Sequence, residues 1–117
     1  MEFKLKKKYK VKNVKGFNMN RKSGHPSLVY WQKDKHTKSL GFETNKDKFV
    51  ETKQLKHNIN PKSNESCFVK TKIENQKYND FYNPYGKYND YRIHKEDKSL
   101  IDIIIKNDKQ KNNKKKK

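Results

Sequence analysis

Apolar and polar positions alternate in short runs through the middle of the chain, and these runs predict β-strands. Residues 27–32 (SLVYWQ) are rich in β-branched and aromatic side chains, and residues 38–44 (KSLGFET) follow after a polar stretch at 33–37. Two such runs around a polar turn are typical of a β-hairpin. Weaker patterns predict further strands at 3–11, 48–55 and 67–73.

The segments between these runs have loop composition. Residues 16–26 are rich in Gly, Asn and Ser, and residues 57–66 contain an Asn-Pro pair that typically starts a turn. Residues 75–91 hold six aromatic side chains, but an Asn-Pro pair and a glycine there argue against a long helix. Because the chain has few aliphatic residues, most of these aromatics are expected in the core or a dimer interface. Exposed tyrosines among lysines would instead form a platform for unpaired bases.

The last apolar run predicts a helix. Glu96 and Asp97 precede the run at 100–105 and lysines follow it, an order of charges that suits a helix dipole. Apolar residues spaced four apart form one face, although the isoleucine run would also suit a buried strand. The expected fold class is mainly β with a C-terminal helix: a small curved sheet or barrel with the helix packed on one side. Residues 1–108 are predicted to form one domain, and residues 109–117 a basic, disordered tail.

Charge defines the class of partner. The 117 residues include 31 Lys and Arg against 13 Asp and Glu, a formal net charge of +18, and only 29% are hydrophobic. The core must therefore be small, and the natural partner is a polyanion. Only Arg21 and Arg92 are arginines, and lysine suits phosphates better than base edges. No apolar run is long enough for a membrane span or a signal peptide, so the cytoplasm is the expected location.

Cysteine and histidine usage narrows the chemistry further. Cys67 is the only cysteine, which excludes a disulfide scaffold and a zinc site built from cysteines. It lies next to apolar residues and is expected to be a small buried hydrophobe. His36, His57 and His94 lie in polar stretches and are expected to be solvated. Because no Asp, Glu and His residues cluster with metal-ligand spacing, no metal or other cofactor is predicted.

Four short motifs occur in order between about Val11 and Lys106. They are the loop Gly24-His25-Pro26, a return strand through Leu40-Gly41-Phe42 to Glu43-Thr44-Asn45, a Ser-Cys-Phe-Val strand from Ser66, and Leu100-Ile101-Asp102 in the final helix. In this order the motifs resemble the PemK/MazF superfamily of toxin ribonucleases, and more narrowly its divergent Gly-His-Pro members. The resemblance covers most of the chain.

The resemblance implies an SH3-like barrel with a C-terminal helix, usually a homodimer, that cleaves single-stranded RNA without a metal. Thr44 stands where the family carries its catalytic threonine or serine, and Asn45 follows it in the same motif as an RNA-binding candidate. Ser66 stands near the serine that lies by the RNA backbone. His25 replaces the arginine of the better-known members, which changes the chemistry because histidine titrates. An acidic, disordered antitoxin would be the protein partner.

Cleavage of RNA by its own 2′-hydroxyl needs a base, an acid and a group that stabilises the charged phosphorane. His25 suits acid or base work because histidine titrates near neutral pH. Thr44 is a hydrogen-bond donor for a phosphate oxygen, and Arg21 and Lys22 precede the loop as neutralising cations. Each has a plainer interpretation as well: His25 as a structural loop residue, Thr44 as strand composition, and Ser66 as a turn residue.

Two other functions fit the same sequence. A non-catalytic nucleic-acid-binding barrel would share the fold and the charge, and His25→Ala would leave its RNA affinity intact. An inhibitor encoded by a phage or mobile element would bind a protein partner and have no nuclease activity. The net charge of +18 argues against mimicry of DNA, which would require an acidic surface.

Overall fold

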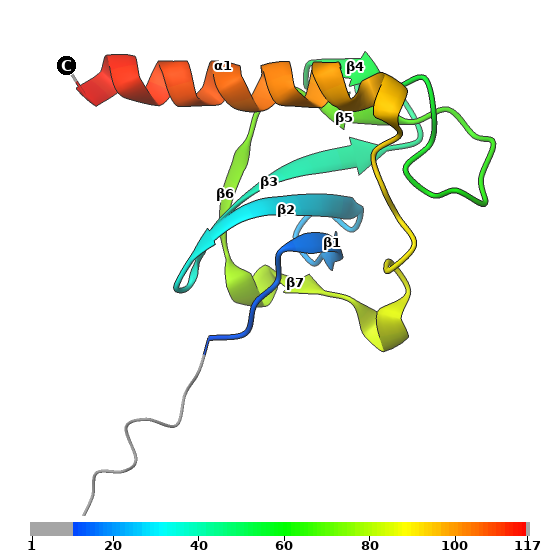
Figure 1. Cartoon of the computed structure of the whole chain (residues 1–117), viewed down its shortest axis with the longest axis horizontal. Helices are drawn as coiled ribbons and strands as arrows, with labels where there is room; N and C mark the ends of the chain where they lie inside the picture. Colours follow the sequence, from blue (N-terminus) through cyan, green and yellow to red (C-terminus); the bar gives the residue numbers. More distant parts are fainter. Residues whose placement is uncertain (1–10, 117) are drawn as a thin grey trace, which may run out of the picture.

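The computed structural model describes residues 11–116, and the side chains of residues 11–109 (Figure 1). Within that range it has seven strands and one long helix, so the expected class, mainly β with a C-terminal helix, is confirmed. The strands are β1 (Gly16–Asn20), β2 (Pro26–Lys33), β3 (His36–Glu43), β4 (Thr52–Gln54), β5 (Phe68–Lys70), β6 (Glu74–Lys77) and β7 (Phe81–Tyr82). The helix is α1 (Lys98–Lys116), and three 3-10 turns are η2 (Tyr78–Asp80), η3 (Pro84–Gly86) and η4 (Lys95–Asp97).

The strands form one antiparallel, open sheet. Its order is β4-β5-β3-β2-β1-β7, and β6 pairs with β3 beside β5. The second half of β3 pairs with β5 through Phe42 and Glu43, whereas its first half pairs with β6. The short turn η2 joins β6 to β7, so the chain passes from the β3 side of the sheet to the β1 side below the curved β2–β3 hairpin (Figure 1).

The predicted hairpin at 27–44 is confirmed as β2 and β3. Leu28 lies opposite Leu40, and the register shifts once, between Val29 and Trp31. The turn places Asp34 at φ 54°, a left-handed conformation that aspartate tolerates better than most residues. Turn chemistry and strand pattern therefore agree here, which is why the sequence identified this hairpin.

The prediction of a loop at 16–26 is wrong for its first part, which forms β1. Asparagine is a poor strand former, but Asn18 and Asn20 are buried and hydrogen-bonded. The Asn18 amide donates to the carbonyl of Val14 at 2.7 Å. That bond is local, but the Asn20 amide donates to Gln76 Oε1 of β6 at 2.7 Å. Hydrogen bonds of buried side chains, the second of them tertiary, thus override local propensity. The strand predicted at 3–11 lies almost wholly outside the described residues.

Other strand predictions hold only in part. The strands predicted at 48–55 and 67–73 shorten to β4 and β5, of three residues each. The segment 75–91 contains no long helix, as predicted, but it contributes β7 and part of β6, which the sequence did not reveal. Of its aromatics, Phe81 and Tyr88 are buried, whereas Tyr85 is fully exposed.

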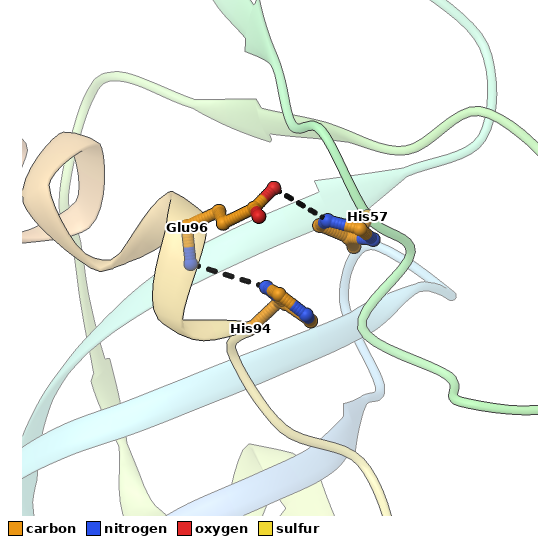
Figure 2. Close-up of side chains that lie close together, drawn as sticks. All are labelled: His57, His94 and Glu96. Atoms are coloured by element: carbon orange, nitrogen blue, oxygen red, sulfur yellow. Dashed lines mark hydrogen bonds and ion pairs between the residues drawn. The ribbon is translucent and has the colours of Figure 1, made fainter.

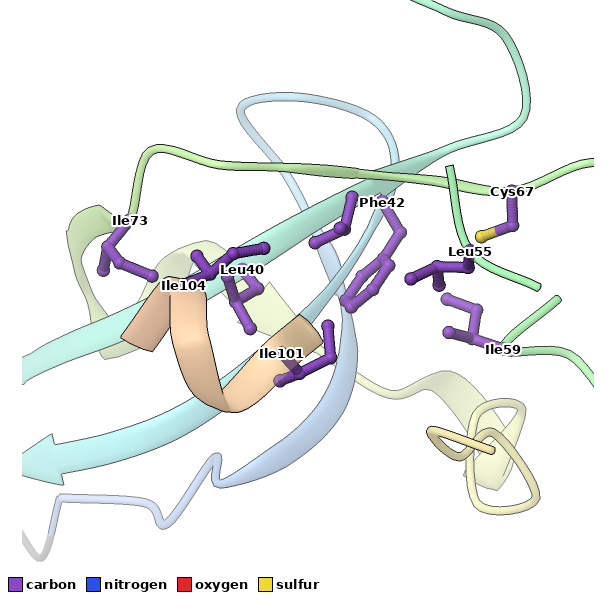
Figure 3. Packing of buried hydrophobic residues seen from close by; sticks show 9 residues of the cluster. Leu40, Phe42, Leu55, Ile59, Cys67, Ile73, Ile101 and Ile104 are labelled. Carbon is purple, nitrogen blue, oxygen red and sulfur yellow. The ribbon is translucent and has the colours of Figure 1, made fainter. Parts of the chain in front are cut away.

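One face of the sheet packs against α1. Leu40 and Phe42 of β3 meet Ile101 and Ile104 of the helix, as Figure 3 shows. The predicted helix and its apolar face are therefore confirmed, and residues 110–116 of the lysine-rich segment continue the same helix. The remaining buried members of this helix-side core are Leu55, Ile59, Cys67, Val69 and Ile73.

The opposite face is mostly polar. Among the described residues, its apolar cluster consists of Val14, Val29 and Phe81, with Tyr78 packed against it. Beside it, the fully buried Asn20 exchanges hydrogen bonds with Gln76: Asn20 Nδ2 donates to Oε1 at 2.7 Å, and Gln76 Nε2 donates to Oδ1 at 3.1 Å. Hydrogen bonds therefore complete a core that has too few aliphatic residues. No helix in the described part of the chain is long and apolar enough to cross a membrane.

Candidate functional site

The Gly-His-Pro loop and Thr44 lie at the same end of the central hairpin. β2 begins at Pro26 and β3 ends at Glu43, and the two strands run antiparallel with Ser27 opposite Gly41. Pro26, Glu43 and Thr44 consequently line one cavity of about 210 Å³. We refer to it as the hairpin-end cavity.

The loop before this cavity is fixed by its backbone. Gly24 has φ 75°, which favours glycine, and its N–H donates to the carbonyl of Asn20 at 2.8 Å. Asn20 N–H donates to the His25 carbonyl at 3.1 Å, and His25 N–H donates to Ser23 Oγ at 3.2 Å. The His25 side chain itself is exposed. Of this loop only Pro26 lines the cavity, so His25 lies beside the cavity and not in its lining.

The far wall of the cavity comes from the loop 58–65. Asn58, Asn60, Ser63 and Glu65 line it, and they brace one another. The Asn58 amide donates to the carbonyl of Glu65 at 3.0 Å, and the backbone N–H of Asn60 donates to Asn58 Oδ1 at 2.8 Å. Sequence reasoning treated this segment only as a loop. Its density of hydrogen-bonding side chains around an Asn-Pro pair was the signal that could have marked it as a binding wall.

The cavity lining also contains a thiol and a phenol, those of the buried Cys67 and the half-buried Tyr91. Cys67 is 3% exposed, as expected of a small hydrophobe, and burial raises the pKa of its thiol. Burial likewise raises the pKa of Tyr91, which lies beside it in the cavity lining. Both groups therefore stay protonated near neutral pH, and neither is a ready nucleophile. The proton-transfer chemistry of the cavity falls to its more exposed groups.

The cations expected beside His25 do not line the hairpin-end cavity. The Arg21 guanidinium lies 4.1 Å from the centroid of the Tyr82 ring, and Lys22 forms an ion pair with Asp80 at 3.9 Å. Both therefore lie on the side of the loop that faces β7 and η2. Asn45 and Ser66 are exposed next to lining residues without lining the cavity themselves.

A second cluster joins the segment after β4 to the start of the helix. Figure 2 shows His57, His94 and Glu96 together: His57 Nε2 donates to Glu96 Oε1 at 2.9 Å, and the backbone N–H of Glu96 donates to His94 Nδ1 at 3.1 Å. The imidazole rings stack with centroids 3.6 Å apart. The hydrogen bond from His57 lowers the pKa of Glu96. Buried Asp97 fixes the same junction by accepting the backbone N–H groups of Lys56 and His57, at 2.7 and 3.0 Å.

This cluster adds contacts that the sequence did not predict, although His57 is exposed as expected. His57 and His94 are not merely solvated, and together with Glu96 they bring three possible metal-ligand atoms within 4.8 Å of one another. The interplanar angle of the two rings is only 22°. An imidazole nitrogen binds an ion in the plane of its ring at about 2.0–2.1 Å, so two nearly parallel stacked rings cannot both reach one ion as they lie. The cluster therefore fits a structural role better than a metal centre: it is a clasp, a set of contacts that holds the segment after β4 against the start of the helix.

Comparisons with protein-family models, with curated proteins and with solved structures find no match to this chain.

Proposed function

We propose that this protein is a metal-independent endoribonuclease of the toxin type, which cleaves single-stranded RNA at the hairpin-end cavity. The proposal includes the finer assignments that the sequence resemblance implies: an SH3-like fold, a homodimer, a cytoplasmic site of action and an acidic antitoxin. One observation carries it. Pro26, the last residue of the Gly24-His25-Pro26 motif, and Thr44 are separate in the sequence but line one cavity. The exposed His25 directly precedes Pro26, and the opposite wall of the cavity consists of amides and hydroxyls.

The reaction needs no group from outside the RNA and the protein. A base removes the 2′-hydroxyl proton, the 2′-oxygen attacks the phosphorus, and the bond from phosphorus to the 5′-oxygen breaks as an acid protonates that oxygen. The products are a 2′,3′-cyclic phosphate and a 5′-hydroxyl. His25 takes one of the two proton-transfer roles, and Glu65, an exposed carboxyl in the cavity lining, takes the other. Thr44 donates a hydrogen bond to a phosphate oxygen.

The test is cleavage of a long single-stranded RNA in the presence of EDTA. His25→Ala is expected to lower the rate about 10²–10⁴-fold, the usual contribution of a general acid or base. Thr44→Ala should lower it about 10²-fold. His36→Ala is the matched control, because His36 is an exposed histidine at the other end of β3. Cleavage that survives His25→Ala, or that EDTA abolishes, would contradict the proposal.

A specific observation favours the second candidate, a non-catalytic RNA-binding protein. Among the described residues, no hydrogen bond or ion pair orients the imidazole of His25, whereas catalytic bases are commonly held by a third group. This candidate predicts RNA binding by wild type and by His25→Ala with equal affinity, and cleavage by neither. The same two proteins in one experiment therefore separate the two functions.

A further inference from the structure

A larger cavity lies on the other side of the Gly-His-Pro loop. It has a volume of about 570 Å³, in the range of small-ligand sites. Ser23 lines this cavity and Pro26 lines the hairpin-end cavity, so His25 lies on the short segment between the two. The other lining residues are Asn20, Lys22, Val50, Lys70, Lys72, Ile73, Glu74, Asn75 and Gln76. We refer to it as the lysine cavity.

The lysines of this cavity differ in how far they are already neutralised. Lys70 is held by Glu43 and Glu74, with its Nζ 3.8 and 3.9 Å from their carboxylates, and its stem runs across Gly41. Lys72 is exposed and forms no ion pair within the described part of the chain. Lys22 has one distant carboxylate partner and a side chain that is 71% exposed. Lys72 and Lys22 are therefore the charges available to an incoming anion.

The same cavity has an apolar side, and an exposed aromatic residue directly precedes one of its lining residues in the chain. Ile73 and Val50 line it, and Phe49 directly before Val50 is 93% exposed. The loop is held in place because Thr71 donates to Glu51, from its backbone N–H at 3.2 Å and from its hydroxyl at 2.9 Å. A chain with so few large hydrophobic residues leaves one of its six phenylalanines in solvent here. An exposed aromatic beside lysines is the combination that binds unpaired bases.

We infer that the lysine cavity binds the nucleotide next to the cleaved phosphate of a single-stranded RNA, an inference that rests on the proposed function. Phe49 stacks on the base, Val50 and Ile73 contact its apolar face, and Lys72 and Lys22 bind the adjoining phosphate. The exposed amide of Asn75 is available to the base edge. A nucleotide is favoured over an acidic peptide because the cavity combines a stacking ring with point charges, whereas a carboxylate needs only the charges.

The test is binding of a fluorescein-labelled, single-stranded 2′-O-methyl oligoribonucleotide of mixed sequence, measured by anisotropy. Its blocked 2′-oxygen cannot attack, so affinity is measured without cleavage. Phe49→Ala should weaken binding about tenfold because it removes the stacked ring, a change of about 1.4 kcal/mol. Lys72→Gln should weaken it about tenfold because it removes a phosphate contact. Lys72→Gln should also reduce the slope of log K against log salt by about 0.7.

Matched controls are Tyr85→Ala and Lys33→Gln, which remove another fully exposed aromatic and another exposed lysine away from the cavity. They should change affinity less than twofold. Equal losses in site and control variants, or no binding by wild type, would overturn the inference. Binding of a polyglutamate peptide is measured in the same way. If Phe49→Ala weakens binding of the peptide but not of the oligonucleotide, the cavity belongs to an acidic protein partner and the inference is wrong.

Cleavage of unmodified RNA, scored separately, distinguishes the two proposals. If binding depends on Phe49 but wild type cleaves no RNA, the nucleotide site stands and the ribonuclease does not. If RNA is cleaved through His25 while Phe49→Ala binds the oligonucleotide normally, the ribonuclease stands and the nucleotide site is wrong.

Discussion

The two faces of the sheet are stabilised by different forces. On the helix side, Leu40, Phe42 and Ile101 belong to a continuous apolar core, where burial of hydrocarbon supplies the free energy. On the opposite side, the largest buried groups include Asn20 and Thr37, and their stability comes from satisfied hydrogen bonds. Successive residues of β2 contribute to the two faces in turn: Leu28 packs toward the helix, and Val29 belongs to the small cluster on the opposite face.

This difference shows how a lysine-rich chain with few aliphatic residues can still fold. It concentrates its apolar residues on one face and fills the other with polar side chains, most of which are hydrogen-bonded to side chains or to the backbone. The buried Ser39 hydroxyl is the exception there, since it has no hydrogen-bond partner among the described residues. The polar face demands directional geometry, because an unsatisfied buried group costs about 1–3 kcal/mol. The Gly-His-Pro loop is attached to this polar face through Asn20. The backbone of Asn20 is hydrogen-bonded to Gly24 and His25, and its side chain is hydrogen-bonded to Gln76.

The largest loss of stability is expected for a substitution on the apolar, helix-side face. Leu40 is fully buried at the centre of the helix-side core, so Leu40→Ala should lower the free energy of unfolding by about 3–4 kcal/mol through lost burial and an added cavity. Urea denaturation measures this change. The control Ile103→Ala, at a residue of α1 that is 54% exposed, should change stability by less than about 0.5 kcal/mol. A similar loss in both variants would show that the helix does not cover the sheet.

A slightly smaller effect is expected on the polar face. Asn20→Ala should lower the free energy of unfolding by about 2–3 kcal/mol, because it removes several hydrogen bonds and leaves Gln76 Oε1 without the donor of its shortest one. The double variant with Gln76→Ala should be less destabilised than the sum of the single variants, with a coupling of about 0.5–3 kcal/mol. Strict additivity in the urea midpoints would contradict the view that this face is one network.

Substitutions of Gly24, in the Gly-His-Pro loop, should change stability only through the backbone conformation that this position requires. Gly24→Ala places a side chain at φ 75° with nothing within 4 Å of its Cβ, so the cost is conformational and about 1 kcal/mol. Gly24→Asn should cost less, because asparagine tolerates the left-handed region. Thermal melting of the two variants tests this order, and a larger loss in Gly24→Asn would show that space rather than φ limits the site.

The smallest effect concerns the clasp at the helix start, and it depends on pH. The folded protein lowers the pKa of Glu96, so the carboxylate stabilises the fold above its unfolded pKa, and this contribution disappears as pH falls through the folded pKa. Glu96→Gln should therefore lower Tm slightly at pH 7 and leave it unchanged in strong acid. The change at pH 7 should be smaller than that of Gly24→Ala. An equal loss at both pH values would exclude the charged hydrogen bond with His57 as its cause.

Sequence patterns predicted those features of the site that depend on local residues. The hairpin of β2 and β3, the loop at Gly24-His25-Pro26 and the final helix followed from alternation, turn residues and charge order. The wall at Asn58–Glu65 and the position of Arg21 against Tyr82 did not follow. The hydrogen bonds within the wall are local, but its position against Pro26 and Thr44, like that of Arg21 on Tyr82, joins residues far apart in the chain, and no local preference encodes it.

By itself the sequence determined the class of the fold, the apolar face of its helix and the sign of its charge, because these depend on residue type and near-neighbour spacing. Only the tertiary structure decided that the asparagine-rich segment at Gly16–Asn20 is a strand, and that His57 and His94 stack. It also decided that two cavities flank His25. Each of these outcomes depends on a partner at a distant position, whose pairing free energy outweighs the local preference of the segment.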